Sequence, residues 1–199
     1  MKKQKLVFGT GINDADYPVT QYEKINGKRV RVWVCPFYDI WCSMLRRCYS
    51  ANSLVKYSSY KDCQVCTEWL TFSNFKKWME QQEWEGRQID KDLLKEGNKL
   101  YCPEHCIFVD RKINSFVTDS KATRGEYMLG VYWHKPRNKF LSKCSNPFTG
   151  EQEHLGYFTS ELEAHLTWKR KKHEHAYALA DSEYCNDPRL SKSLKSRYL

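Results

Sequence analysis

The chain lacks any long apolar run. None of its hydrophobic stretches approaches the roughly 20 residues that a membrane-spanning helix needs, although 41% of the 199 residues are hydrophobic. The N-terminal segment is basic, but it contains no apolar stretch long enough for a secretory signal peptide. With 29% charged residues, the sequence predicts a soluble globular protein that has no membrane partner and resides in the cytoplasm.

Because a secretory signal is missing, the nine cysteines are not expected to form disulfides. Reduced thiols are either small buried apolar groups or metal ligands. Cys63 and Cys66 have the spacing of a zinc knuckle, and Cys102 and Cys106 offer a second pair. The 35 residues between the pairs exceed the usual zinc-ribbon interval, and Cys48 is an alternative ligand. A structural zinc site and a packed thiol cluster both stay open.

Negative charge is also scarce, and the formal net charge is +9. The excess lies in two flanks: residues 20–50 carry +4 from six basic and two acidic residues, and residues 110–145 carry +5 from eight and three. The segment between them, 51–109, carries −1 from eight basic and nine acidic residues. A polyanion such as DNA laid across both flanks would cover this near-neutral centre. Ordinary solvated surface charge explains either flank equally well.

Alternation, turns and capping residues predict a mixed α+β organisation without internal repeats. In the first half we expect a strand at 28–34, a helix from 36 to about 49, an exposed loop at 50–60 and a helix from about 71 to 85. In the second half we expect three strands at about 129–134, 139–145 and 153–158, then a helix that begins at Ser160 and a final helix opened by Asp187-Pro188.

Between these halves the chain reads Ile89-Asp90-Lys91-Asp92, then a Gly97-Asn98 turn, then a second strand around His105 and a helix from about Asp110. This arrangement brings a carboxylate, an imidazole and a lysine close together. Such a set is suited to a small divalent-metal site.

These residues, together with Trp41–Tyr49, Val65–Phe72 and Tyr101–Glu104, resemble a group of bacteriophage proteins of the HNH endonuclease type. The resemblance covers about residues 36–117 and implies a ββα-metal unit that hydrolyses DNA with Mg²⁺ or Mn²⁺. It implies that Asp90 and His105 are metal ligands and that Asn98 is the middle asparagine. Lys91 stands where this family has its general-base histidine.

A lysine at its ordinary pKa is charged at neutral pH and cannot accept a proton. Carboxylates beside Lys91 strengthen that preference, so Lys91 is interpreted as a phosphate clamp. Water activation would then fall to Asp92, to the metal or to another residue. The alternative interpretation makes Asp90-Lys91-Asp92 a solvated strand end and His105 an ordinary half-buried histidine.

Gly130-Val131, Lys139-Phe140, His154–Phe158 and Glu163-Ala164 resemble the skeleton of the plant ethylene-response-factor (APETALA-type) DNA-binding domain. The resemblance covers about residues 127–180 and implies a three-stranded antiparallel sheet packed on one helix, with its exposed face in the major groove. This domain also occurs fused to phage homing endonucleases. The family favours several arginines on that face, and this chain has few, so strong bidentate reading of guanine is not expected. The sheet could instead pack onto its own partner domain.

We therefore expect four parts: a basic segment (1–35), an HNH-like core (36–117), a linker (118–126) and a sheet-plus-helix domain (127–199). The expected function is that of a phage-type protein that binds double-stranded DNA and, if active, is a metal-dependent endonuclease. The alternatives are a catalytically degenerate DNA-binding regulator, or a protein that binds and inhibits a host protein through aromatic surface. Residues expected to contact DNA are Arg29, Arg31, Tyr132, His134, Arg137, Lys139, Lys143 and Ser145.

Overall fold

The computed structural model describes residues 5–118 and 125–199. The chain divides into two units, Met1–Phe108 and Val109–Leu199, each with its own packing. Small sheets and helices make up both units, so the described residues form a mixed α+β fold. Most of the expected linker, residues 118–126, lies outside the described residues.

The first unit begins with two strands and ends with strands around the Asp90 loop. Its elements are β1 (Thr20–Ile25), β2 (Lys28–Val34), α1 (Pro36–Tyr49), α2 (Ala51–Lys56), β3 (Gln64–Val65), α3 (Phe72–Met79), β4 (Gln88–Asp90), β5 (Leu100–Tyr101) and β6 (Ile107–Val109), whose last residue opens the second unit. Helix α1 matches its expected position, and α3 begins where expected but ends at Met79, six residues before the expected end.

An aromatic core holds α1 and α3 together. Trp41 of α1 and Trp69 are fully buried, and the indole Nε1 of Trp41 donates a hydrogen bond to the backbone oxygen of Trp69 at 2.7 Å. Phe72 and Phe75 of α3 pack on these rings, with centroids 5.5 Å from Trp41 and 5.1 Å from Trp69 respectively. Such rings bury large apolar areas, and the polar N–H needs a partner when it is buried.

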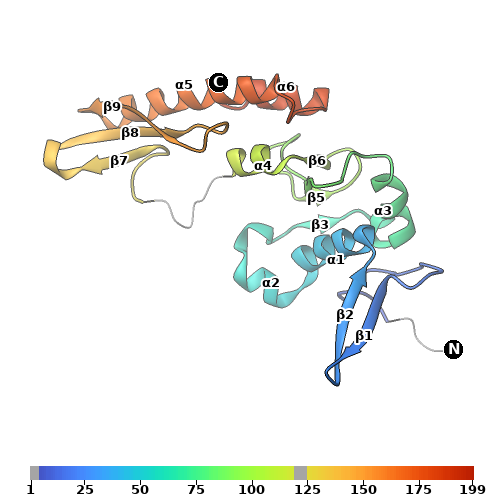
Figure 1. Cartoon of the computed structure of the whole chain (residues 1–199). Helices are drawn as coiled ribbons and strands as arrows, with labels where there is room; N and C mark the ends of the chain where they lie inside the picture. The colour runs from blue at the N-terminus through green and yellow to red at the C-terminus, as the bar shows by residue number, and fades with distance from the viewer. Residues whose placement is uncertain (1–4, 119–124) are drawn as a thin grey trace. The chain divides into compact units, whose positions relative to one another are not determined.

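The short strands pair over very different sequence distances. Strands β1 and β2 form an antiparallel hairpin across Asn26 and Gly27, whose φ angles of 52° and 76° suit these two residues. Strand β3 pairs with β5 in parallel, and β4 pairs with β6. The β1–β2 hairpin extends from the end of α1 as an arm that no other element of its unit covers (Figure 1).

An exposed loop was expected at residues 50–60, but most of this segment is helical. Residues 51–56 form the helix α2, and Ser58–Tyr60 form a 3₁₀ turn. The backbone N–H of Leu54 donates to the oxygen of Ser50, so the chain closes a helical turn directly after α1. This helix buries no residue, so its sequence carries no apolar period from which it could be predicted.

The second unit contains α4 (Arg111–Val117), β7 (Val131–His134), β8 (Lys139–Ser145), β9 (Gln152–Phe158), α5 (Glu161–Ala180) and α6 (Pro188–Ser196). Side chains cap three of its helices: Ser160 and Asp187, as expected, and also Asp110. Each accepts a backbone N–H in the first turn. The strands form one antiparallel sheet in the order β7-β8-β9.

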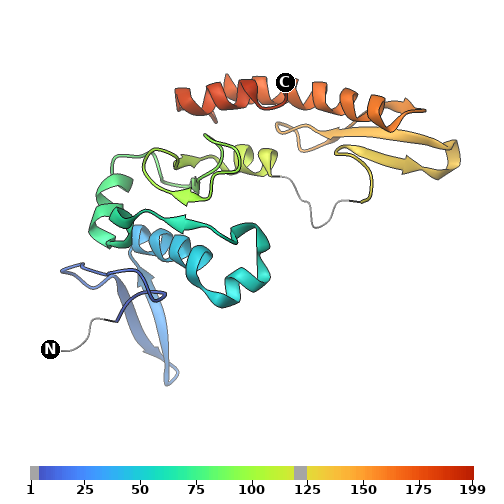
Figure 2. The same cartoon turned by 180° about the vertical axis from the view of Figure 1, so that it is seen from behind.

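Helix α5 covers one face of this sheet, as the views from both sides show (Figures 1 and 2). The buried hydroxyl of Ser142 on β8 donates to the backbone oxygen of Ala164 on α5 at 2.8 Å. At Gly130, which precedes β7 with a φ of 76°, a Cβ atom would lie 2.0 Å from the ring of Trp168 on α5. The sheet and α5 therefore approach closely, and the opposite face of the sheet is left open.

Candidate functional site

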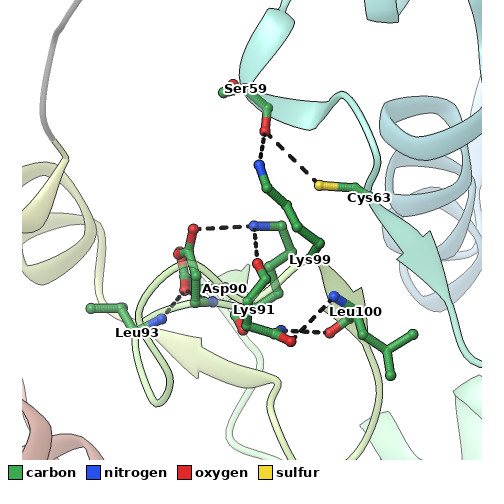
Figure 3. Close-up of polar contacts among 9 residues, drawn as sticks. Ser59, Cys63, Asp90, Lys91, Leu93, Lys99 and Leu100 are labelled. Carbon is green, nitrogen blue, oxygen red and sulfur yellow. Dashed lines mark hydrogen bonds and ion pairs between the residues drawn. The ribbon is translucent and has the colours of Figure 1, made fainter.

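The Asp90 carboxylate sits at the end of β4 and shapes the loop that follows. Its Oδ1 accepts the backbone N–H groups of Asp92 and Leu93, both at 2.8 Å (Figure 3). Burial raises the pKa of Asp90 to about 6, and the nearby charge of Asp92 adds to this effect. One carboxylate oxygen is thus committed to the fold of the loop.

Lys91 is almost fully buried, with 6% of its surface exposed. Its ammonium donates to Asp92 Oδ2 at 3.1 Å and to the backbone oxygen of Asn98 at 3.0 Å (Figure 3). Burial by itself lowers the pKa of Lys91, but the charge and hydrogen bond of Asp92 outweigh it and raise the pKa above its ordinary value. Lys91 is therefore a fixed cation and a hydrogen-bond donor at neutral pH. It is no general base.

Asn98 closes the same loop from its other end. Its Nδ2 donates to the backbone oxygens of Lys91 and Leu100, both at 2.7 Å, and its Oδ1 accepts the N–H of Leu100 at 3.3 Å. Gly97 precedes it with a φ of 75°. Lys91 and Asn98 thus exchange backbone and side-chain hydrogen bonds, and together they fix the loop 91–98. Asn98 therefore stabilises this loop, and its assignment as the middle asparagine of an HNH site stays a prediction.

His105 lies half-buried in the turn between β5 and β6, where its backbone N–H donates to the oxygen of Cys102 at 3.2 Å. Within residues 5–118 and 125–199, no three His, Cys, Asp or Glu side chains come together as a group that could hold a metal ion. Among these residues, Asp90 and His105 are therefore not part of a group of three such side chains. A magnesium or manganese site there stays a prediction.

The cysteines expected for zinc fall into two neighbourhoods. Burial raises the pKa of Cys48 to about 12, and Cys63 lies close enough to add to the shift. Burial likewise raises the pKa of Cys106, with smaller contributions from Cys102, Asp90 and Cys66. The thiolate, and not the protonated thiol, is the form of cysteine that binds a metal. A raised pKa keeps these thiols protonated, so a metal would have to displace their protons in order to bind. The free thiols are packed in or beside the core, and a zinc site stays a prediction.

The open face of the β7–β9 sheet collects the residues that were expected there. Tyr132 lies opposite Leu141, which lies opposite Tyr157, and His134 lies opposite Lys139. Directly opposed residues share a face, so these five form one surface. Alternation along β8 adds Lys143 and Ser145 to it, and Arg137 lies in the β7–β8 turn.

Tyr157 is the centre of this face. The rings of His134 and His154 lie 4.9 and 4.8 Å from its ring centroid, and the guanidinium of Arg137 lies 4.5 Å above it. Sequence reasoning missed Tyr157 and His154. Tyr157 could have been placed by its alternation with Phe158, but His154 could not. A bulge at Leu155 shifts the register and brings His154 to the open face.

The open face carries no carboxylate among the strand residues 131–134, 139–145 and 152–158. The one acidic residue in these strands, Glu153, lies on the opposite face, where its Oε2 is 3.4 Å from both Lys171 and His175 of α5. The cations of the open face therefore have no acidic neighbour on their own strands. This charge separation favours a polyanionic ligand.

The β1–β2 hairpin presents a second basic surface. Lys24 lies opposite Arg29 and Tyr22 opposite Arg31, so three cations share one face. The guanidinium of Arg29 lies 4.1 Å from the Tyr22 ring centroid. Both faces of the hairpin are exposed. Arg29 and Arg31 are therefore accessible for the DNA contact that was expected of them.

No known protein-family model matches the chain, and neither a curated protein nor a solved structure matches it. No helix of the described residues has the length and apolarity needed to cross a membrane.

Proposed function

We propose that this chain is a double-stranded DNA-binding protein that places the open face of β7–β9 against the duplex. The supporting observation is the charge separation across the sheet, with Arg137, Lys139 and Lys143 on the open side and Glu153 on the side of α5. Cations neutralise phosphates, and a ribbon of strands fits the width of the major groove. The Tyr157 cluster supplies flat rings for contacts with sugars or bases.

Fluorescence anisotropy with a labelled duplex at several salt concentrations tests this proposal. Arg137→Gln and Lys143→Gln should each weaken binding and reduce the slope of log K against log salt by about 1. Arg170→Gln is the matched control, because it removes the same charge from the exposed side of α5. Equal losses in all three variants would contradict the use of the open face. Absent or salt-insensitive binding would favour a protein partner instead.

Metal-dependent hydrolysis of DNA is the second candidate function. It is favoured by the raised pKa of the buried Asp90 carboxylate beside the fixed cation of Lys91. A plasmid-nicking assay with Mg²⁺ or Mn²⁺ decides it, with Asp90→Asn and His105→Ala as the variants. The asparagine keeps an oxygen for the two backbone N–H groups, so the loop is preserved. Cutting that both changes abolish supports the nuclease; no cutting by the unchanged protein leaves a DNA-binding protein with a degenerate core.

A further inference from the structure

A hollow of about 690 Å³ opens in the second unit. Its walls are α4, the turn that joins β8 to β9, and Lys172 of α5. Lys172 of α5 places the hollow beside the helix side of the sheet, and Ser145, at the end of β8, is the one lining residue that was also assigned to the open face. Its volume is in the range of ordinary small-molecule sites.

The hollow is lined by three cations and one carboxylate. Arg111 and Lys112 come from the first turn of α4, and Lys172 reaches in from α5. The carboxylate, Asp110, already accepts the backbone N–H of Lys112 at 2.7 Å as the helix cap. Among the described residues, none of the three cations forms an ion pair with an acidic side chain. The lining therefore has an excess of positive charge, with Asp110 as its one carboxylate.

Lys172 is the most unusual of the three. Its ammonium lies 3.5 Å from the centroid of the Phe116 ring and donates to the backbone oxygen of Phe116 at 2.7 Å. Burial lowers the pKa of Lys172 to about 8, because the packed ammonium is cut off from water without a carboxylate to replace it. Proteins normally pair a buried charge. An anion in the hollow would provide the missing partner.

Neutral groups complete the lining. Ser115 and Ser145 line the hollow, and Ser145 Oγ accepts a hydrogen bond from Gln152 Nε2. The ring of Tyr184 forms one wall and carries the Lys112 ammonium 4.1 Å from its centroid. Guanidinium, ammonium and hydroxyl donors around one space are the groups that bind phosphate oxygens. The remaining volume beside Tyr184 leaves room for a nucleoside.

We propose that this hollow binds a phosphate group, carried either by a free nucleotide or by the backbone of DNA, with Arg111, Lys112 and Lys172 as its ligands. The site shares Ser145 with the open face of β7–β9, but its three cations are not among the cations of that face. The guanidinium of Arg111 can donate two parallel hydrogen bonds to the phosphate oxygens. Lys112 of α4 and Lys172 of α5 each contribute one ammonium group.

Calorimetric titration of the full chain tests the site with inorganic phosphate, adenosine monophosphate and a short DNA duplex. Arg111→Gln should weaken binding of the phosphate-bearing ligand about tenfold or more. Lys172→Met should do the same while keeping an apolar stem over Phe116. Arg170→Gln, an exposed change on α5, should leave the affinity unchanged. Because Arg111 is exposed, its variant is informative even if Lys172→Met does not fold.

The ligands separate the two sources of phosphate. Binding of adenosine monophosphate or inorganic phosphate that falls in Arg111→Gln identifies a free phosphate ligand, even if the chain binds no duplex. Duplex binding that falls in Arg111→Gln, without binding of either small ligand, identifies backbone phosphate. The proposal is overturned if Arg111→Gln and Arg170→Gln behave alike with all three ligands.

Discussion

Lys91 shows how one buried cation can organise a loop. Its ammonium joins a carboxylate next to it in the sequence to a carbonyl seven residues away. The raised pKa keeps the proton in place, so the bond to Asn98 persists across the neutral pH range. The HNH resemblance places Lys91 at the position of the general-base histidine, and in this structure the Lys91 ammonium is a hydrogen-bond donor within the loop.

Lys91→Met should destabilise the first unit by about 1–3 kcal/mol, because the Asn98 carbonyl loses its buried donor. Urea unfolding followed by tryptophan fluorescence measures this, since Trp41 and Trp69 lie in the core of the same unit. Lys99→Met is the matched control. Lys99 also donates to a carbonyl, that of Ser59, but at an exposed site, so its loss should cost less than about 1 kcal/mol. Equal losses would contradict the role of Lys91.

Asp90→Asn should change how stability depends on pH. The folded pKa of about 6 lies above the ordinary value of 3.8, so between these values the folded state holds a proton that the unfolded state releases. The Asp90 carboxyl therefore lowers the free energy of unfolding as pH rises through this window. The variant does not titrate, so it should gain up to about 3 kcal/mol relative to the unchanged protein between pH 4 and pH 7. Urea titrations in a chelating buffer measure this, and parallel pH curves would contradict it.

At the scale of residues, the sequence predicted the charge state of Lys91 but not its partners. Two acidic neighbours were enough to indicate a charged lysine, because adjacent residues are close in any fold. The bonds to Asn98 depend on how the loop 91–98 closes, which local sequence does not determine. The same limit applies to Tyr157 and His154, whose shared face depends on a bulge.

At the scale of elements, local signals were predictive and distant pairings were not. The helices α4, α5 and α6 begin at capping side chains that the sequence displays. The parallel pair of β3 and β5 joins two-residue strands separated by more than thirty residues. Neither strand is long enough to show a period.

Gly130 makes the contact between the sheet and α5 testable. Gly130→Ala places a methyl group into the Trp168 ring at a φ of 76° and should cost at least about 3 kcal/mol. Gly150→Ala is the matched control, because Gly150 has a φ of 77° but no atom within 4 Å of the added Cβ. That change should cost about 1 kcal/mol from backbone strain alone. Thermal unfolding of both variants measures the difference, and similar losses would contradict a tight contact at Trp168.

At the scale of the whole molecule, both units are basic. Residues 1–108 carry +4 from 17 basic and 13 acidic residues, and residues 109–199 carry +5 from 16 and 11. The sequence indicated this distribution, because charge counting needs no fold. Which cations share a surface required the strand register.

The second unit should fold and bind duplex DNA by itself. A fragment of residues 109–199 retains the sheet, α5 and the open-face cations, so we expect a folded circular-dichroism spectrum and measurable duplex binding. Its salt dependence should be shallower than that of the full chain, because the basic residues of 20–50 are missing. An unfolded fragment, or one without affinity while the full chain binds, would contradict this prediction.

The β1–β2 hairpin has a consequence for the solubility of the protein. Both of its strands are edges, and Ile25, Val30, Val32 and Trp33 are exposed on it. Such a ribbon is a template for edge-to-edge pairing between copies of the chain. The cations of the hairpin act as gatekeepers, because like charges keep two ribbons apart. A polyanion that neutralises them would remove this protection, so under the proposed DNA binding we expect aggregation to be strongest when DNA covers the chain only in part.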